Sequence, residues 1–276
     1  MRLGGTVCCS DPAAWEDALA ASEFRAITAP FTCETPREET ERYLEITDRH
    51  DVLIAEVGVW RNLFDRENGK ANIEYAKRQL ELADRLGIAC CVNVAGTESP
   101  AGWDGADPGN YSAEMYERTV ASIREIIDDV NPKQACYSIE PMPWMIPDGP
   151  DEYLKLIRDV DRAHFAAHMD FVNMINSPRR FLGAEAFIEE CFAKLAPHIR
   201  STHLKDSRMD LMRLTTVLEE CDPGEGALDF TKVLRIIDRY LPPDAPVLLE
   251  HMTTFEEYRK AYKVVAAAAE KAGVAI

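Results

Sequence analysis

The chain has 276 residues, of which 46% are hydrophobic, and this is enough to build the core of one large globular domain. Its 31 basic and 48 acidic side chains leave a net charge of −17, which disfavours nucleic acid and membrane surfaces as partners. The chain has no apolar run of about 18 residues, the length that spans a membrane. Residues 1–7 are too polar and too short to form a signal peptide, so we expect a cytoplasmic protein.

Eight strand-like runs rich in apolar residues follow one another along the chain. Several of them are almost continuously apolar, as expected of parallel strands that are covered on both faces. They comprise residues 3–9, 25–31, 52–60, 88–94, 134–140, 165–170, 200–205 and 247–250.

The segments between these runs show the spacing of amphipathic helices. The clearest comprise residues 71–87, 112–130, 229–240 and 255–272, while residues 13–23 form a short helix in a weaker first unit. Ser112 and Asp229 are the predicted N-caps of two of these helices, and Gly87 and Gly273 are predicted C-caps.

Strands that alternate with helices indicate βαβ units with right-handed crossovers, and eight such units point to a closed barrel. We therefore predict an α/β protein with a single (β/α)8 TIM barrel domain over residues 1–276. An open sheet that binds a dinucleotide would need a glycine fingerprint after its first strand, but no GxGxxG follows Gly4 and Gly5.

The chain contains eight cysteines, and none of them forms a CxxC pair. This argues against a thiolate zinc site and against a thioredoxin-like redox motif. We predict that the cysteines are reduced, buried thiols, as is usual in the cytosol.

The two longest irregular segments, residues 96–110 and 141–150, each follow a predicted strand. In a TIM barrel such loops build the active site. Trp60 ends a strand, and Trp103 and Trp144 lie in these loops. An aromatic ring beside polar groups suits stacking on the face of a sugar, although it can equally serve to anchor a loop.

Four predicted strands end in a residue that can bind a divalent metal ion, namely Glu140, Asp170, His203 and Glu250. In a closed parallel barrel these strand ends meet on one rim, so the four side chains should converge there. Three carboxylates and one imidazole suit a hard or borderline ion. We predict one divalent metal ion, with Mn²⁺ as first choice and Mg²⁺, Co²⁺ or Zn²⁺ as alternatives.

Five short motifs occur in a consistent order: AEVG at 55–58, SIEP at 138–141, HLKD at 203–206, GEGALDF at 224–230 and LEH at 249–251. With this order and spacing, nearly the whole chain resembles the xylose isomerase-like barrels, a family of sugar phosphate isomerases and epimerases. In that family, residues equivalent to Glu140, Asp170, His203 and Glu250 hold one divalent ion. The resemblance also implies a homo-oligomer, either a dimer or a tetramer.

The function that the resemblance implies is a metal-dependent isomerase or epimerase acting on a keto sugar or a sugar derivative. A base removes a proton next to a carbonyl group, while the ion stabilises the enediolate as a Lewis acid. Glu140 and Glu250 are the predicted catalytic residues, because the equivalent glutamates of ketose 3-epimerases deprotonate one face and reprotonate the other.

The positions that would face the substrate depart from those of the free-ketose epimerases. Those enzymes carry Asn-Arg and a second Glu after the strand-five Glu-Pro, whereas here residues 142–146 are Met-Pro-Trp-Met-Ile. Their His three residues after the strand-six Asp is replaced by Asn173, and their Arg six residues after the strand-seven His is Met209. The residues that match the metal ligands of the family are present, but the residues at the substrate-facing positions differ from those of the free-ketose epimerases.

Seven residues are predicted to contact the substrate: Glu56, Trp60, Trp144, His168, Asn173, Lys205 and Asp206. Lys205 could neutralise an enediolate or bind an anionic group, or it could form a salt bridge to a rim acid. His168 could orient a ligand or be a satisfied interior histidine.

Three more residues near the rim need an interpretation. His251 should point away from it, because His251 follows Glu250 and neighbouring strand residues face opposite sides. Arg179 and Arg180 could bind an anionic group of the substrate, or they could be ordinary surface charge.

Other functions stay open at this stage. A metal-dependent lyase or dehydratase on an oxidised sugar, an inosose or a keto-glycoside, including C-glycoside cleavage, would begin with the same proton removal and then expel a β-leaving group. An endonuclease of the endonuclease IV type shares the barrel, but it needs a richer ligand set for three zincs and a basic DNA face. A non-catalytic binding barrel would not need paired carboxylates.

Overall fold

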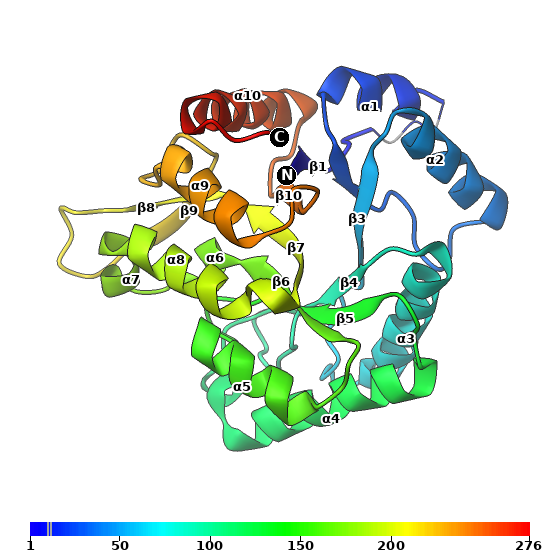
Figure 1. Cartoon of the computed structure of the whole chain (residues 1–276). Coiled ribbons are helices and arrows are strands. Elements are labelled where there is room, and N and C mark those ends of the chain that lie inside the picture. Colours follow the sequence, from blue (N-terminus) through cyan, green and yellow to red (C-terminus); the bar gives the residue numbers. More distant parts are fainter. Residues whose placement is uncertain (10, 12) are drawn as a thin grey trace.

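A closed barrel of eight parallel strands forms the centre of the computed structural model, which describes residues 1–9, 11 and 13–276 (Figure 1). Around the barrel the strands lie in the order β1-β10-β7-β6-β5-β4-β3-β2. They are β1 Arg2–Gly5, β2 Ala26–Thr28, β3 Leu53–Gly58, β4 Cys90–Asn93, β5 Cys136–Ile139, β6 Phe165–Asp170, β7 Ile199–Leu204 and β10 Pro246–Leu249. The predicted (β/α)8 TIM barrel is confirmed.

Helices surround the barrel and cover the outer faces of its strands (Figure 1). They are α1 Trp15–Ser22, α2 Arg37–Arg49, α3 Gly69–Leu86, α4 Ala113–Val130, α5 Pro150–Val160, α6 Phe171–Met174, α7 Pro178–Leu182, α8 Ala184–Leu195, α9 Phe230–Tyr240 and α10 Phe255–Ala272, with 3₁₀ turns at Pro108–Tyr111 and Ala196–His198. None of the helices in the described part of the chain combines the length and the apolar character that crossing a membrane requires.

The predicted helix caps are confirmed. The Ser112 side chain accepts a hydrogen bond from the backbone N–H of Met115 at the start of α4, and Asp229 does the same at the start of α9. Helix α3 ends at Gly87 with φ +72°, a left-handed conformation that is strained for a residue with a side chain.

The main core lies between the barrel and the helices. Leu80 of α3, Ile126 of α4 and Phe192 of α8 are fully buried there. Burying one such side chain stabilises the fold by about 1.5–3 kcal/mol. The two ends of the chain meet, because the N-terminal amino group of Met1 donates a hydrogen bond to the carbonyl oxygen of Ala275 at 2.8 Å (Figure 1).

The eight cysteines are free thiols. Cys90, Cys91, Cys136 and Cys191 are buried as predicted, while the other four are half-buried. Burial raises the pKa of the Cys191 thiol to about 12, which keeps it protonated and unreactive at neutral pH.

A two-stranded antiparallel hairpin follows β7, and the sequence did not predict it. Its strands are β8 Asp206–Met209 and β9 Leu218–Cys221. Figure 1 shows it as a yellow arm that extends away from the barrel. Since the hairpin starts directly after β7, its base lies at the rim where the predicted metal ligands stand.

Candidate metal centre

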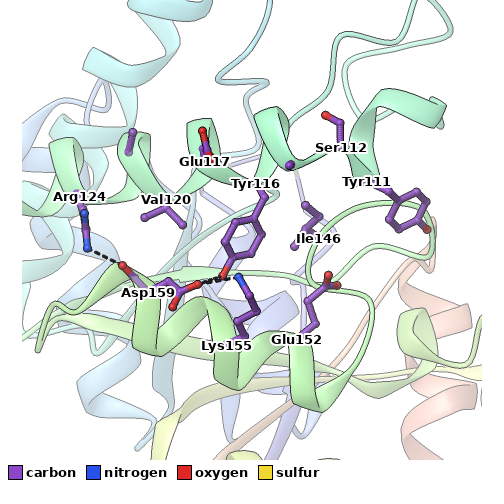
Figure 2. Close-up of a pocket in the computed structure, with 12 residues that line it drawn as sticks. Tyr111, Ser112, Tyr116, Glu117, Val120, Arg124, Ile146, Glu152, Lys155 and Asp159 are labelled. Carbon is purple, nitrogen blue, oxygen red and sulfur yellow. Dashed lines mark hydrogen bonds and ion pairs between the residues drawn. The ribbon is translucent and has the colours of Figure 1, made fainter.

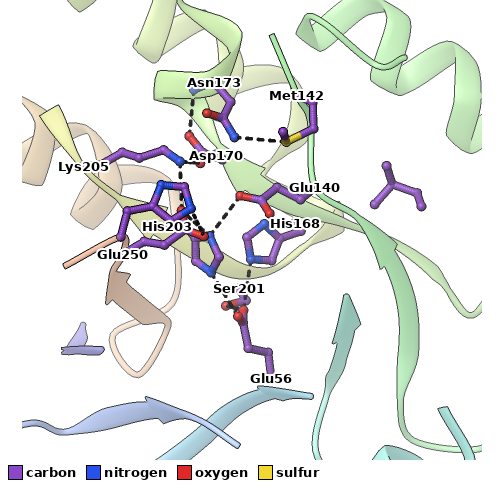
Figure 3. A network of polar contacts seen from close by, with 12 residues as sticks. Glu56, Glu140, Met142, His168, Asp170, Asn173, Ser201, His203, Lys205 and Glu250 are labelled. Carbon is purple, nitrogen blue, oxygen red and sulfur yellow. Dashed lines mark hydrogen bonds and ion pairs between the residues drawn. The ribbon is translucent and has the colours of Figure 1, made fainter. Parts of the chain in front are cut away.

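The four predicted metal ligands converge at the C-terminal rim of the barrel. Ligand atoms of Glu140, Asp170, His203 and Glu250 all lie within 4.8 Å of one another (Figure 3). Glu140 and Glu250 directly follow β5 and β10, Asp170 ends β6, and His203 lies near the end of β7. His203 Nδ1 is 3.1 Å from Glu140 Oε1 and 3.0 Å from Glu250 Oε2, so two carboxylates approach the imidazole from different strands.

The Asp170 carboxylate shows that this group of side chains suits a cation. Its Oδ1 accepts a hydrogen bond from the backbone N–H of Asn173 at 2.8 Å, which caps α6. Its Oδ2 is buried and is paired with the ammonium group of Lys205, whose Nζ lies 2.7 Å away. Buried carboxylates are costly unless cations compensate their charge, and here one ammonium group is shared by Asp170, Glu250 and Glu220. Three carboxylates and one imidazole therefore fit a divalent ion.

The close approach of these carboxylates and cations also shifts the pKa values of Asp170 and Glu250. Burial raises the pKa of the Asp170 carboxyl, and the charge of Lys205 does not offset this. Burial acts in the same direction on Glu250, but the charges of His203 and Lys205 hold the pKa of Glu250 well below its usual range. A divalent cation among these groups would relieve the repulsion between their carboxylates.

A second polar layer lies beneath the cluster. Glu56 Oε1 is 3.0 Å from His203 Nε2, while Glu56 Oε2 is 3.0 Å from His168 Nε2 and accepts a hydrogen bond from Ser201 Oγ at 2.5 Å. The rings of His168 and His203 meet edge to face, with centroids 4.1 Å apart. Because Glu56 is an acceptor, it favours a proton on His203 Nε2, and this would leave Nδ1 to bind an ion in the cluster (Figure 3).

This layer corrects two of the predicted substrate contacts. Glu56 is 1% exposed and His168 is completely buried, so neither side chain can reach a molecule at the rim. Both lie one layer deeper in the barrel than Glu140 and Asp170. Of the two interpretations of His168, the structure supports an interior histidine, and one of its ring nitrogens, Nδ1, has no partner among the described residues.

Replacing Glu56 with glutamine should lower the affinity for Mn²⁺ by about 10–100-fold, the usual effect of losing the carboxylate that orients a ligand histidine. Isothermal titration of the metal-free protein with Mn²⁺ measures this. The matched control is Glu225→Gln, because Glu225 is an exposed carboxylate that is paired with Lys260 and does not belong to the cluster. An unchanged affinity in folded Glu56→Gln protein would contradict the orienting role.

Lys205 lies at the edge of the cluster and is completely buried. Its Nζ is 2.7 Å from Asp170 Oδ2, 2.9 Å from Glu250 Oε2 and 3.3 Å from Glu220 Oε2. Burial would lower the pKa of this lysine, but the negative charges of Asp170 and Glu250 raise it well above the usual value. Of the predicted alternatives, the structure shows the salt bridge to rim acids, with the ammonium group beside Glu250.

Asp206 does not face the site, contrary to the prediction. Its buried carboxylate accepts backbone N–H groups at 2.8–3.1 Å from Ser207, Gly224, Gly226 and Leu228. A Cβ on Gly226 would lie 2.2 Å from Asp206 Oδ1, so this close approach requires glycine. Asp206 therefore ties the hairpin to the loop that follows it, because it projects to the side opposite Lys205.

A cavity of about 550 Å³ lies next to the cluster, between the loop after β5, α6 and the base of the hairpin. Its lining comprises Asp104, Met142, Pro143, Trp144, Val172, Asn173, Ile175, Asn176, Ser207, Leu218, Glu219, Glu220 and His251. The Trp144 indole is 36% exposed and is held in place by a hydrogen bond from its Nε1 to the carbonyl oxygen of Asp104 at 2.7 Å. Of the predicted contacts, Trp144 and Asn173 line this cavity.

Trp60 lies outside this cavity. Its indole is half-buried and packs against Gly58, where a Cβ would lie 1.9 Å from the ring nitrogen. Trp103, in the loop after β4, is 44% exposed and likewise does not line the cavity. Trp60 therefore anchors the end of β3, which is the structural alternative considered for these tryptophans.

Two residues of the site were not found from the sequence. His251 Nε2 is 3.2 Å from Glu250 Oε1, and its Nδ1 is 2.6 Å from Glu220 Oε1. The prediction that His251 points away from the rim is wrong, because its φ of +65° breaks the alternation of the strand. Glu220 comes from β9, and nothing in the polar sequence of the hairpin signals that this strand reaches the rim.

A larger cavity of about 760 Å³ lies on the outside of the barrel, between α4 and α5 (Figure 2). Three of its polar groups are already paired with one another, since Tyr116 Oη donates to Asp159 Oδ2 at 2.7 Å and Lys155 Nζ is 2.7 Å from the same oxygen. None of the predicted ligands or catalytic residues lines it. The cavity beside the metal cluster is therefore the candidate substrate site.

Several solved structures share this fold. A D-psicose 3-epimerase, solved in the presence of D-fructose, is 15% identical with a TM-score of 0.72, covering 99% of this chain and 100% of its own. A probable 3-DHS dehydratase involved in petrobactin synthesis from Bacillus anthracis is 16% identical with a TM-score of 0.74, covering 96% and 99%. A xylose isomerase-like TIM barrel protein from Mycobacterium smegmatis in complex with magnesium is 17% identical with a TM-score of 0.68, covering 96% and 92%.

At these identities the solved structures establish the fold alone, and the search of curated proteins found no match. The sequence itself establishes more, because the family model described as xylose isomerase-like TIM barrel matches residues 16–268. This match spans most of the barrel and includes the four candidate metal ligands. The chain therefore belongs to the xylose isomerase-like TIM barrel family.

Proposed function

We propose that the protein is an enzyme, a divalent-metal-dependent isomerase or epimerase that acts on a keto sugar or sugar derivative, with Mn²⁺ as the preferred ion. The observation that carries this proposal is the placement of Glu140 and Glu250 on two sides of His203 Nδ1, with Asp170 completing a set of four ligand atoms within 4.8 Å of one another. The epimerase fold of D-psicose 3-epimerase supports it as an analogy.

Each residue of the cluster has a distinct task in this proposal. Glu140, Asp170, His203 and Glu250 would hold the ion, which when bound supplies Lewis-acid stabilisation of charge on the carbonyl and hydroxyl oxygens. Glu140 and Glu250 approach from β5 and β10, so one can remove the proton next to the carbonyl and the other can return a proton on the opposite face.

The surrounding residues support proton transfer in other ways. Glu56 fixes the ring orientation of His203 from below. The Lys205 ammonium group, 2.9 Å from Glu250, lowers the cost of negative charge at the rim. Trp144 and Met142 form an apolar wall of the cavity, and they offer a surface on which the C–H face of a sugar can lie.

The first test is the metal content of protein purified without chelator, followed by incubation with ketoses in D₂O. We expect about one divalent ion per chain and deuterium at the carbon next to the carbonyl group of the recovered sugar. Protein that binds no ion after reconstitution would contradict the proposal. Loss of water or of an aglycone from the sugar would instead identify a metal-dependent lyase or dehydratase on the same site.

A further inference from the structure

We infer that the substrate is an uncharged sugar, without a phosphate or carboxylate group; this rests on the proposed function and names the substrate class of the same site. Three features of the rim carry the inference. They are a backbone amide cluster already filled by the Asp206 carboxylate, basic side chains that are paired within the protein or line a different cavity, and a cavity wall without lysine or arginine among its described residues.

The first feature is the backbone amide cluster in the loop after the hairpin. TIM barrels commonly bind a phosphate group with loops that follow strands seven and eight, where backbone N–H groups point at the anion. Here such amides, among them those of Gly224 and Gly226, donate to the Asp206 carboxylate at 3.1 and 3.0 Å. Asp206 is fully buried and is the first residue of β8, so the fold holds its carboxylate in place. These amides are therefore not available to a substrate phosphate.

The second feature is the pairing of the nearby cations. Lys205 already contacts three carboxylates. Arg180 Nη1 donates to the carbonyl oxygens of Asp148 and Met174 at 2.6 and 2.9 Å and to Asn176 Oδ1 at 2.9 Å. Both Arg179 and Arg180 line a separate cavity outside the site. The arginines that could have bound an anionic group are therefore turned away from the cluster.

The third feature is the wall of the cavity itself. Among its thirteen described lining residues there is no lysine or arginine. Three are acidic, of which Glu219 is paired with Arg208 and Glu220 with His251, while Asp104 adds a further negative charge. The two ring nitrogens of His251 are taken up by Glu220 and Glu250. A phosphate dianion would stand against this wall without a free cation to compensate its charge.

The same wall offers a neutral group that matches sugar hydroxyls. Asn173 contributes a neutral side-chain amide, which can donate a hydrogen bond to a sugar hydroxyl and accept one from it. The Asn176 amide is already paired with Arg180 and Pro143. The Ser207 hydroxyl group is buried.

The test compares matched pairs of sugars with the metal-loaded protein in D₂O at low ionic strength. The pairs are D-fructose and D-fructose 6-phosphate, D-ribulose and D-ribulose 5-phosphate, and D-tagatose and D-tagatose 6-phosphate. We expect kcat/KM for deuterium incorporation to be at least about tenfold higher for the uncharged member of each reactive pair. Equal rates, or faster exchange in the phosphorylated member, would overturn the substrate class and leave the proposed function intact. No exchange in any sugar, with the ion bound, would count against the proposed function and the inference together.

A variant of the cavity wall tests whether the charge of the site causes the preference. Asp104→Asn removes one wall charge, and we expect the ratio between uncharged and phosphorylated sugars to fall by about threefold. The control Asp244→Asn removes the same charge from an exposed carboxylate before β10, at the opposite end of the barrel, and should leave the ratio unchanged. Equal ratios in both variants and the wild type would contradict a role of the wall.

Discussion

Replacing His203 with alanine is expected to abolish tight binding of the divalent ion and, with it, exchange of solvent deuterium into the sugar. His203 Nδ1 is the only nitrogen among the four candidate ligands, and it lies within 3.1 Å of both flanking glutamates. Without it, two buried carboxylates and the half-buried one of Glu250 face one another with no imidazole between them, which disfavours both the ion and the ionised acids. We expect an exchange rate lower by at least about 10³, as for the loss of a Lewis acid worth several kcal/mol.

The measurement pairs metal content per chain with the exchange rate, each in the wild type and in the variant. His198→Ala is the matched control, because His198 is a half-buried histidine in the 3₁₀ turn before β7, at the opposite end of that strand from the rim. Retention of about one ion per chain by folded His203→Ala protein would exclude His203 as a ligand.

The barrel and the convergence of the four candidate metal ligands could be predicted because topology alone brings these residues together. Glu140, Asp170, His203 and Glu250 lie at or next to the ends of four strands that neighbour one another as β10-β7-β6-β5. Once the strands are parallel and the barrel is closed, those ends must share one rim, whatever the exact register of each pair.

Depth within the barrel was harder to predict, because it depends on the stagger of the strands. Alternation tells which face Glu56 and His168 occupy, but both stand two residues before the end of their strand. That distance, about 6–7 Å along the strand, separates a rim residue from one buried beneath the cluster. A substrate contact and an orienting contact therefore look alike in the sequence.

The remaining errors arise where the chain leaves its regular pattern. His251 follows the end of β10 with a positive φ, so it turns toward Glu250 instead of away from it. The hairpin has no alternating apolar pattern, and it brings Glu220 to the rim while its first residue, Asp206, binds backbone amides. Such contacts depend on the path of a loop, and the sequence contains no periodic signal for it.

The second large effect is expected from replacing Glu140 or Glu250. If the two glutamates act as two bases, each replacement should affect a different proton transfer. At saturating Mn²⁺, Glu140→Gln and Glu250→Gln should each slow interconversion of the two epimers by about 10²–10⁴, the usual contribution of a positioned acid–base group. Each variant removes only one of the two proton transfers. The remaining glutamate should therefore still exchange the proton of one epimer with D₂O, and the two variants should retain exchange in opposite epimers.

This pattern separates a catalytic role from a purely metal-binding one. Metal content must be measured in both variants, because Glu140 and Glu250 also stand among the four ligand candidates, and glutamine keeps one oxygen that can coordinate. If each variant holds its ion and loses exchange in both epimers, a single base serves both faces and the second glutamate only positions it. If either variant interconverts the epimers at the wild-type rate with the ion bound, that glutamate takes no part in proton transfer. Only if the two variants retain deuterium exchange in opposite epimers does Glu140, after β5, act on one face of the sugar and Glu250, after β10, on the other.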